Sequence, residues 1–299
     1  MIIELRVLEY FLAIAREQNI SAAAEFLHLS QPTLSRQMKE LEESLGKVLF
    51  IRGNRKITLT EEGMILRKRA QEILDLVKRT EDEISLTDEI VAGDIYIGAG
   101  ETEAIRLIAK ALYHLHGDYP KICCHIASGD TTDVIERLDR GLYDFGFILS
   151  QVDNSKYEYI EIPYHDTYGI LMRKDHPLAD KKEITPQDLE QLPLIVNRNI
   201  HDGDLFTTWL KKSSDEINIV ATYNLLYNAS IMVEEGLGCA LALDKIINVS
   251  KHSKLCFIPL APPLQIKIYL IWKKYQKLSK AGEKFLEKVY DMFEDQPQS

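Results

Sequence analysis

The chain has 299 residues, of which 45% are hydrophobic and 27% are charged. This length suits two or three domains, and this composition is typical of a globular protein rather than a disordered or fibrous one. The apolar run at residues 266–272 is interrupted by Lys267 and is too short to cross a bilayer, and the N-terminus shows no secretory pattern. We therefore expect a cytoplasmic protein without membrane contact.

The formal net charge is −10 at pH 7, and the charged residues are distributed unevenly along the chain. Residues 28–70 carry nine lysines and arginines against five acidic residues, so this segment is +4 and the rest of the chain is −14. Whole-chain charge is a poor guide when two domains are fused, whereas a local basic segment is what DNA binding requires. The distribution indicates DNA binding by one end and a separate task for the other.

Three helices are predicted at the start of the chain. Apolar residues recur every three or four positions over residues 4–17, which is typical of a helix with one buried face. Ser21 is placed to cap a short helix over residues 22–27, and Ser30 to cap a third helix over residues 31–44. Two short helices, a tight turn and a third helix form the layout of a helix-turn-helix.

The third helix has one apolar face and one polar, cationic face. The apolar side carries Leu34, Met38, Leu41 and Leu45, and the opposite side carries Pro32, Ser35, Arg36 and Lys39. Small polar side chains can enter a major groove, and an arginine can pair with guanine or with a phosphate. Any surface helix can carry such residues, so this helix alone leaves both interpretations open.

A β-hairpin is predicted after the third helix. Residues 48–51 and 56–59 are β-prone, and the turn between them contains Gly53 and two arginines, Arg52 and Arg55. Arginines gathered at a hairpin tip suit a phosphate or the minor groove, although a solvated loop is the alternative. The hairpin therefore has the character of a DNA-binding wing.

The ordered pattern over residues 11–63 resembles the signature of LysR-type transcriptional regulators, a bacterial family. The resemblance is carried by residues 21–46, by Leu49-Phe50 and Arg52, and by Leu59-Thr60 and Glu62-Gly63. It implies a mainly α winged helix-turn-helix, a long linker helix and a two-lobed α/β effector domain like a periplasmic binding protein. It implies DNA contacts by Gln31, Pro32, Ser35 and Arg36 and wing contacts by Arg52 and Arg55. Ser21, Thr33 and Lys39 are further candidate DNA contacts in the same segment.

A long helix is predicted after Thr60, which is placed as its cap, and runs to about Ser85. Its apolar seam follows a heptad spacing through Leu66, Ala70, Ile73, Val77, Thr80 and Ile84. A second copy of the chain would bury this seam, and the alternative is packing on the chain's own core. The family resemblance favours a homodimer or homotetramer that binds a dyad-symmetric operator in double-stranded DNA.

The remainder of the chain alternates predicted strands and helices, which indicates a parallel sheet covered on both faces. We expect strands at residues 94–99, 122–127, 144–149, 168–173, 194–196, 217–221, 239–243 and 266–272. We expect helices at residues 104–116, 132–140, 186–192, 204–212, 228–235 and 280–293.

This pattern gives three predicted domains. They are the DNA-binding domain at residues 1–60, the linker helix at 61–89 and the effector domain at 90–299. Lobe I is expected at about 90–162 and 267–299, and lobe II at about 163–266, with crossings near Pro163 and residues 262–267.

In sheets of this kind, ligands bind beyond the carboxyl ends of the strands, near helix N-termini. The positions that border this place are Thr102, Ser128, Asp130, Thr131, Leu149, Asn197, His201 and Asn228. Ordinary helix capping is the alternative role for the polar members. Several family members carry an arginine or an extra hydroxyl where this chain has Leu149 and Asp130, which speaks against a simple anionic effector. Arg198 or a helix N-terminus could still hold a carboxylate.

No metal site or cofactor is expected. The cysteines are Cys123, Cys124, Cys239 and Cys256, which form no C-x-x-C pair, and we interpret them as buried apolar thiols. An enzyme is the weakest interpretation, because no nucleophile elbow, phosphate loop or nucleotide fingerprint is present. A solute receptor without DNA binding is the other alternative, and a gel-shift assay would distinguish it from a regulator.

Overall fold

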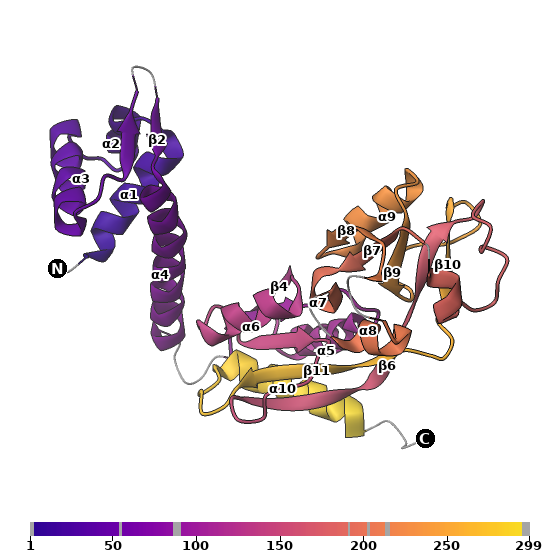
Figure 1. Cartoon of the computed structure of the whole chain (residues 1–299). Helices are drawn as coiled ribbons and strands as arrows, with labels where there is room; N and C mark the ends of the chain where they lie inside the picture. Colours follow the sequence, from indigo (N-terminus) through magenta and orange to yellow (C-terminus); the bar gives the residue numbers. More distant parts are fainter. Residues whose placement is uncertain are drawn as a thin grey trace. The chain divides into compact units, whose positions relative to one another are not determined.

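The computed structural model describes residues 3–53, 56–85, 91–190, 192–201, 204–212 and 216–294. Internal contacts divide the chain into two compact units, Met1–Leu86 and Thr87–Ser299 (Figure 1). None of the helices within the described ranges is long and apolar enough to cross a membrane.

The first unit is a winged helix-turn-helix with a long additional helix. Its elements are α1 (Leu5–Glu17), α2 (Ile20–Phe26), α3 (Gln31–Leu45), β1 (Phe50–Arg52), β2 (Ile57–Leu59) and α4 (Glu61–Ser85). The strands β1 and β2 pair antiparallel, as the wing prediction requires. The core lies between the helices and includes Phe11, Leu34 and Met38, each at most 1% exposed. The fold of this unit therefore agrees with the sequence pattern.

The helix ends agree with expectation at α3 but differ at α2. The side chain of Asn19 accepts hydrogen bonds from two backbone amides, and α2 begins at Ile20, so the prediction of Ser21 as the cap is wrong. Asparagine is as good a cap as serine, so the cap preference alone does not exclude Asn19. Ser30 caps α3, and Gly46 ends it with a φ of 64°, as predicted.

The predicted seam of α4 divides into two parts. Leu66 and Ala70 pack against the core of the first unit, so intramolecular packing is the correct alternative there. Ile73 and Ile84 remain 43% and 79% exposed. The second part of the seam therefore lacks an apolar partner within the described residues of this unit.

The second unit is built on a mixed sheet in the order β4-β3-β5-β11-β6-β9-β7-β8, with β10 also paired to β6. The strands are β3 (Gly93–Ala99), β4 (Ile122–Ser128), β5 (Phe145–Ile148), β6 (Tyr157–Arg173), β7 (Leu194–Asn197), β8 (Ile219–Tyr223), β9 (Cys239–Leu243), β10 (Leu255–Pro259) and β11 (Gln265–Lys273). Strand β3 is parallel to β4 and β5, and β7 is parallel to β8 and β9. The prediction of an entirely parallel sheet is wrong, because β6, β10 and β11 pair antiparallel.

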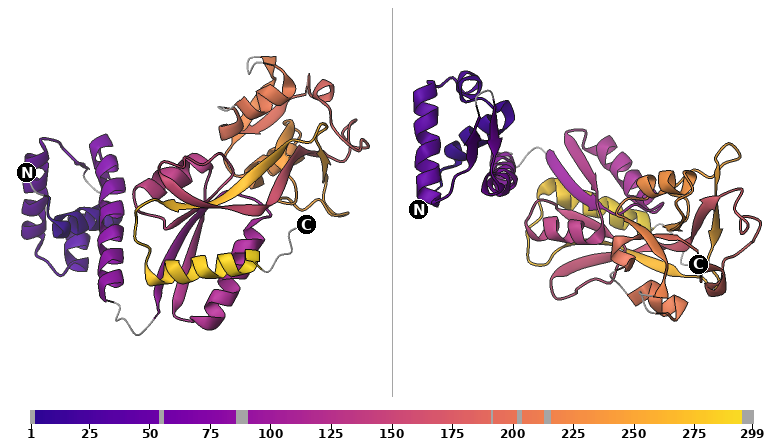
Figure 2. Two further views of the ribbon diagram at one scale, coloured as in Figure 1. Left: turned by 90° about the horizontal axis from the view of Figure 1, so that it is seen from below. Right: turned by 45° about the horizontal axis from the view of Figure 1, so that its top comes forward.

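Two lobes share this sheet. Lobe I contains β3, β4, β5, β11 and the first part of β6, with α5 (Ile105–Asp118), α6 (Thr131–Asp139) and α10 (Lys280–Glu294). Helices α5 and α10 lie side by side (Figure 2). They cover one face of the sheet, and α6 packs on the other.

Lobe II contains β7 to β10 and the second part of β6. Its helices are the 3-10 helix η1 (Pro186–Leu189), α7 (Arg198–His201), α8 (Asp204–Leu210) and α9 (Leu226–Glu234). The predicted helix at 186–192 is thus a single short turn. The predicted strand at 168–173 is the end of a strand that begins at Tyr157.

The cysteines do not share one environment. Cys239 is buried, Cys124 and Cys256 are partly buried, and Cys123 is exposed. The prediction of four buried thiols is therefore wrong for Cys123, which lies on β4 at the edge of the sheet.

Candidate functional site

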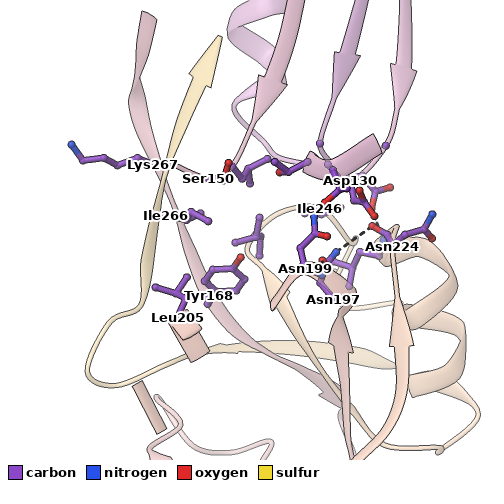
Figure 3. Close-up of a pocket in the computed structure, with 18 of the residues that line it drawn as sticks. Asp130, Ser150, Tyr168, Asn197, Asn199, Leu205, Asn224, Ile246, Ile266 and Lys267 are labelled. Atoms are coloured by element: carbon purple, nitrogen blue, oxygen red, sulfur yellow. Dashed lines mark hydrogen bonds between the residues drawn. The ribbon is translucent and has the colours of Figure 1, made fainter. Parts of the chain in front are cut away.

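A cleft of about 830 Å³ lies between the two lobes, at the carboxyl ends of the parallel strands (Figure 3). Its volume is within the range of small-molecule sites, about 300–1,000 Å³. Lobe I contributes loops that follow β3, β4 and β5, and lobe II contributes residues that follow β7, β8 and β9. Polar side chains on its lining include Glu101, Asp130, Thr131, Asn197, Asn199 and Asn224.

The structure brings together part of the predicted effector set. Asp130, Thr131, Leu149 and Asn197 line the cleft. Thr102, Ser128 and Asn228 are not among the lining residues of the described chain, and the side chain of His201 lies outside the described part. Thr102 is 5% exposed, and its hydroxyl donates a hydrogen bond to the Asp166 carboxylate.

Sequence reasoning missed the lining residues Tyr168 and Asn224, whereas it considered the segment at 100–102, which contains Glu101, and took Asn199 as a weaker candidate. Asn224 comes directly after Tyr223, the last residue of β8, so a search of every strand end would have included it. Tyr168 lies within β6, and no sequence signal placed it at the cleft because its strand was predicted to begin there.

Two helix N-termini at the cleft, those of α6 and α9, are bound by carboxylates of the chain itself. Asp130 accepts a hydrogen bond of 2.9 Å from the backbone amide of Asp133 in the first turn of α6. Glu101, in lobe I, accepts a hydrogen bond from the backbone amide of Leu226 at the start of α9 in lobe II. A carboxylate is stabilised at a helix N-terminus, so Glu101 bridges the two lobes at a favourable place.

The charged lining residues give the cleft an acidic character. Glu101, Asp130 and Lys267 are the charged side chains among the described lining residues. The Lys267 ammonium lies 2.8 Å from the Glu161 carboxylate and points away from the other labelled residues (Figure 3). Two carboxylates therefore face the cleft without an opposing cation from its lining.

Asp166 is a buried carboxyl at the crossing between the lobes. It lies on β6 and is 1% exposed, and its Oδ1 has no hydrogen-bond partner among the described atoms. Burial raises the pKa of Asp166 to about 6, and the hydrogen bond from Thr102 opposes this shift only in part. Burial removes water from the carboxylate, so the protonated form persists to a higher pH than in an exposed aspartate.

The predicted DNA-contacting residues of α3 lie on one surface. Gln31, Pro32, Thr33, Arg36 and Lys39 are exposed, and Ser35 is partly exposed. Ser21 is exposed at the start of α2. The side chain of Arg52 and the whole of Arg55 lie outside the described part.

Two surface ion pairs hold the cations of α3. The Arg36 guanidinium is 3.7 Å from Glu40, and the Lys39 ammonium is 3.4 Å from Glu43. All four side chains are more than half exposed, and such pairs contribute little stability. A phosphate or a base can therefore replace the glutamate partners at small cost.

The wing is attached to α3 by Glu42, which sequence reasoning did not identify. Its carboxylate accepts hydrogen bonds of 2.7 and 3.2 Å from the backbone amides of Leu49 and Phe50. Two bonds from one side chain fix where β1 begins relative to α3, so the helix and the wing are held as one surface.

A winged helix-turn-helix joined to a two-lobed α/β unit with a small-molecule cleft defines a ligand-responsive DNA-binding transcription regulator. Residues 5–64 match the family described as "Bacterial regulatory helix-turn-helix protein, lysR family", and residues 89–294 match "LysR substrate binding domain". The chain belongs to the LysR family of transcriptional regulators.

Relatives and solved structures agree with this assignment. The chain is 30% identical over 277 residues to the Hca operon transcriptional activator HcaR of Escherichia coli, covering 91% of this chain and 92% of HcaR. It is 33% identical over 198 residues to the regulator OxyR of E. coli, covering 66% and 64%. The fold is similar to full-length CbnR in complex with its target DNA, with a TM-score of 0.73 and 22% identity over 97% of this chain and 99% of CbnR.

Proposed function

We propose that this LysR-family regulator binds a dyad-symmetric operator as a dimer, with α3 in the major groove and the wing on the flanking backbone. The observation that carries the proposal is the surface of α3, where polar and cationic side chains are exposed opposite the buried Leu34 and Met38. The exposed second part of the α4 seam supports pairing of two copies, because coiled-coil seams bury such residues. A regulator acts where the genome lies, so the proposal places it in the cytoplasm.

Arg36→Ala is expected to weaken binding to a duplex selected from the organism's own genome. The loss should be about 1–3 kcal/mol and confined to the specific site if Arg36 reads a base. If it holds a phosphate, all duplexes should weaken alike, and the dependence of log affinity on log salt should become shallower by about 0.9. Fluorescence anisotropy at several salt concentrations distinguishes these results, and titration at high concentration should saturate at two chains per duplex.

Lys110→Ala is the matched control for the DNA-binding experiment. Lys110 is an exposed cation on α5 of the second unit, so its removal changes the net charge by the same amount at a different place. We expect wild-type affinity for this variant. Unchanged affinity and salt dependence in Arg36→Ala would contradict the proposed role of α3.

We further propose that the cleft binds, without chemical conversion, a neutral or cationic polar ligand. The two carboxylates on the lining disfavour an anion there, because the Lys267 ammonium is paired with Glu161 and no other cation is among the described lining residues. The carboxamides of Asn197, Asn199 and Asn224 and the hydroxyl of Tyr168 suit hydroxyl or amine groups.

The charge of the effector can be tested before it is identified. Metabolites extracted from the organism are separated on an anion exchanger, and each fraction is assayed for a change in operator affinity. We expect the unretained fraction to change the operator affinity by about 5–150-fold, which is typical of coupled sites. The affinity of the protein for the purified ligand should change by the same factor when operator is present. Activity found only in the retained, anionic fraction would refute the proposed ligand class, and activity in no fraction would refute effector control.

Asn199→Leu is expected to abolish this response while operator affinity stays at the wild-type value, since Asn199 lines the cleft and not α3. Asn228→Leu is the matched control, because Asn228 is exposed on α9 and is not among the described lining residues. An equal response from both variants would show that the ligand binds elsewhere.

A further inference from the structure

Three metal-ligating side chains lie together at the edge of the lobe I sheet, outside the cleft. Asp94 is on β3, and Cys123 and His125 are on the edge strand β4. In the parallel register, Asp94 pairs with Cys123 and Tyr96 pairs with His125. Alternate residues of a strand share a face, so all four side chains project on the same side of the sheet.

The distances within this group suit a small cation. The carboxylate, thiol and imidazole ligand atoms lie within 4.8 Å of one another. The His125 Nε2 and the Asp94 Oδ1 are 3.4 Å apart. Bonds of about 2.0–2.3 Å to a tetrahedral zinc ion place two ligand atoms roughly 3.3–3.7 Å apart, so this pair already has the spacing of two zinc ligands.

Tyr96 holds both of these side chains. Its ring stacks on the His125 imidazole with centroids 4.7 Å apart and an interplanar angle of 17°. Its hydroxyl lies 3.5 Å from the second carboxylate oxygen of Asp94 and donates toward it. Outer contacts of this kind orient metal ligands in characterised sites.

We propose that Asp94, Cys123 and His125 bind a Zn²⁺ ion that links β3 to β4. A thiolate, an imidazole and a carboxylate are the donors that zinc takes in proteins, and three protein ligands leave the fourth position to water. An ordinary surface ion pair would account for Asp94 and His125. It would not account for an exposed thiol beside them on the same face.

Cobalt provides a spectroscopic test on the full-length, reduced and metal-free protein. Titration with Co²⁺ is expected to saturate at one equivalent per chain and to produce the near-ultraviolet charge-transfer band of a cobalt thiolate. Zn²⁺ should then remove the band, because zinc binds the same ligands more tightly than cobalt. Failure to saturate at one equivalent, or the lack of a thiolate band, overturns the proposal.

Cys123→Ser is expected to abolish the thiolate band, and Cys124→Ser is the matched control. Cys124 is the neighbouring cysteine on the opposite face of β4, partly buried against the lobe I core, and its variant should keep the band. A band that persists in Cys123→Ser, or that disappears only in Cys124→Ser, refutes the assignment.

Asp94→Asn and His125→Ala measure the other two ligands. Each should weaken zinc affinity by at least about tenfold, since even an outer-shell partner contributes about 10–100-fold. All three ligand side chains are exposed, so the variants should fold, and wild-type urea unfolding of the second unit in metal-free buffer checks that they do. Wild-type zinc affinity in both variants would leave only a cysteine-bound metal and would contradict the three-ligand site.

Discussion

The Phe11→Ala variant is expected to lose about 3–5 kcal/mol of the unfolding free energy of the first unit, and with it specific operator binding. Phe11 is 0% exposed at the centre of the helix-turn-helix core. Its ring contacts that of Phe50 at the start of the wing, with centroids 5.1 Å apart. Removal of the ring leaves a cavity that the short helices cannot fill without moving α3 relative to β1.

A loss of this size is a large part of the stability of a small domain, which is typically about 5–15 kcal/mol. Chemical unfolding followed by circular dichroism, together with operator anisotropy, would measure both effects. The second unit has its own cores and should unfold as in the wild type, so a two-step transition would assign the loss to the first unit.

Phe26→Ala is the matched control for this substitution. Phe26 belongs to the same unit but is 55% exposed, and the Arg16 guanidinium lies 3.9 Å from its ring centroid. Loss of an exposed cation–π contact costs about 0.5–1 kcal/mol. An equal loss of stability in both variants would contradict the central role of Phe11 in the core.

The helices of the first unit could be predicted from the sequence because each has its own local signals. The three-to-four spacing of apolar residues, Ser30 and Gly46 are sufficient to place α3. The prediction for α2 differed by two residues because Asn19 and Ser21 are both good caps. Propensity alone does not choose between two competent caps that stand two residues apart.

The mixed sheet was harder to predict because its antiparallel strands carry no distinctive pattern. Strand β6 has 17 residues and serves both lobes, so its buried positions follow two different cores in succession. Its alternation is therefore interrupted, and only its apolar end, residues 168–173, was recognised. The pairing of β10 with β6 depends on a contact between segments about 85 residues apart, which no local window contains.

The cleft was predicted in position but only partly in composition. Ligands generally bind at the carboxyl ends of the strands in sheets with parallel strands. Asp130 and Asn197 could therefore be placed at the cleft from the order of the strands. The role of Glu101 depends on the approach of α9 from the other lobe. The inward orientation of Thr102, toward Asp166, likewise depends on β6.

Asp166→Asn is expected to increase the stability of the second unit above about pH 6. Burial raises the pKa of Asp166 to about 6 in the folded protein, whereas its ordinary value is 3.8. Between these two values the folded state binds more protons than the unfolded state, so the unfolding free energy falls as the pH rises through this window and then levels off. A shift of about two pKa units lowers the free energy of unfolding by at most about 3 kcal/mol.

The asparagine variant keeps an oxygen that can accept the hydrogen bond from Thr102 but carries no charge to bury. Its advantage over the wild type should therefore be largest near neutral pH and should shrink as the pH falls toward about 4, because the folded wild-type carboxyl is then protonated and no charge is buried. Urea unfolding of the second unit across this range measures the difference. Asp180→Asn, which removes an exposed carboxylate, should keep the wild-type profile. A constant difference between Asp166→Asn and wild type at every pH would mean that the Asp166 carboxylate is compensated in the folded protein, and the lobe crossing would then not be pH-sensitive.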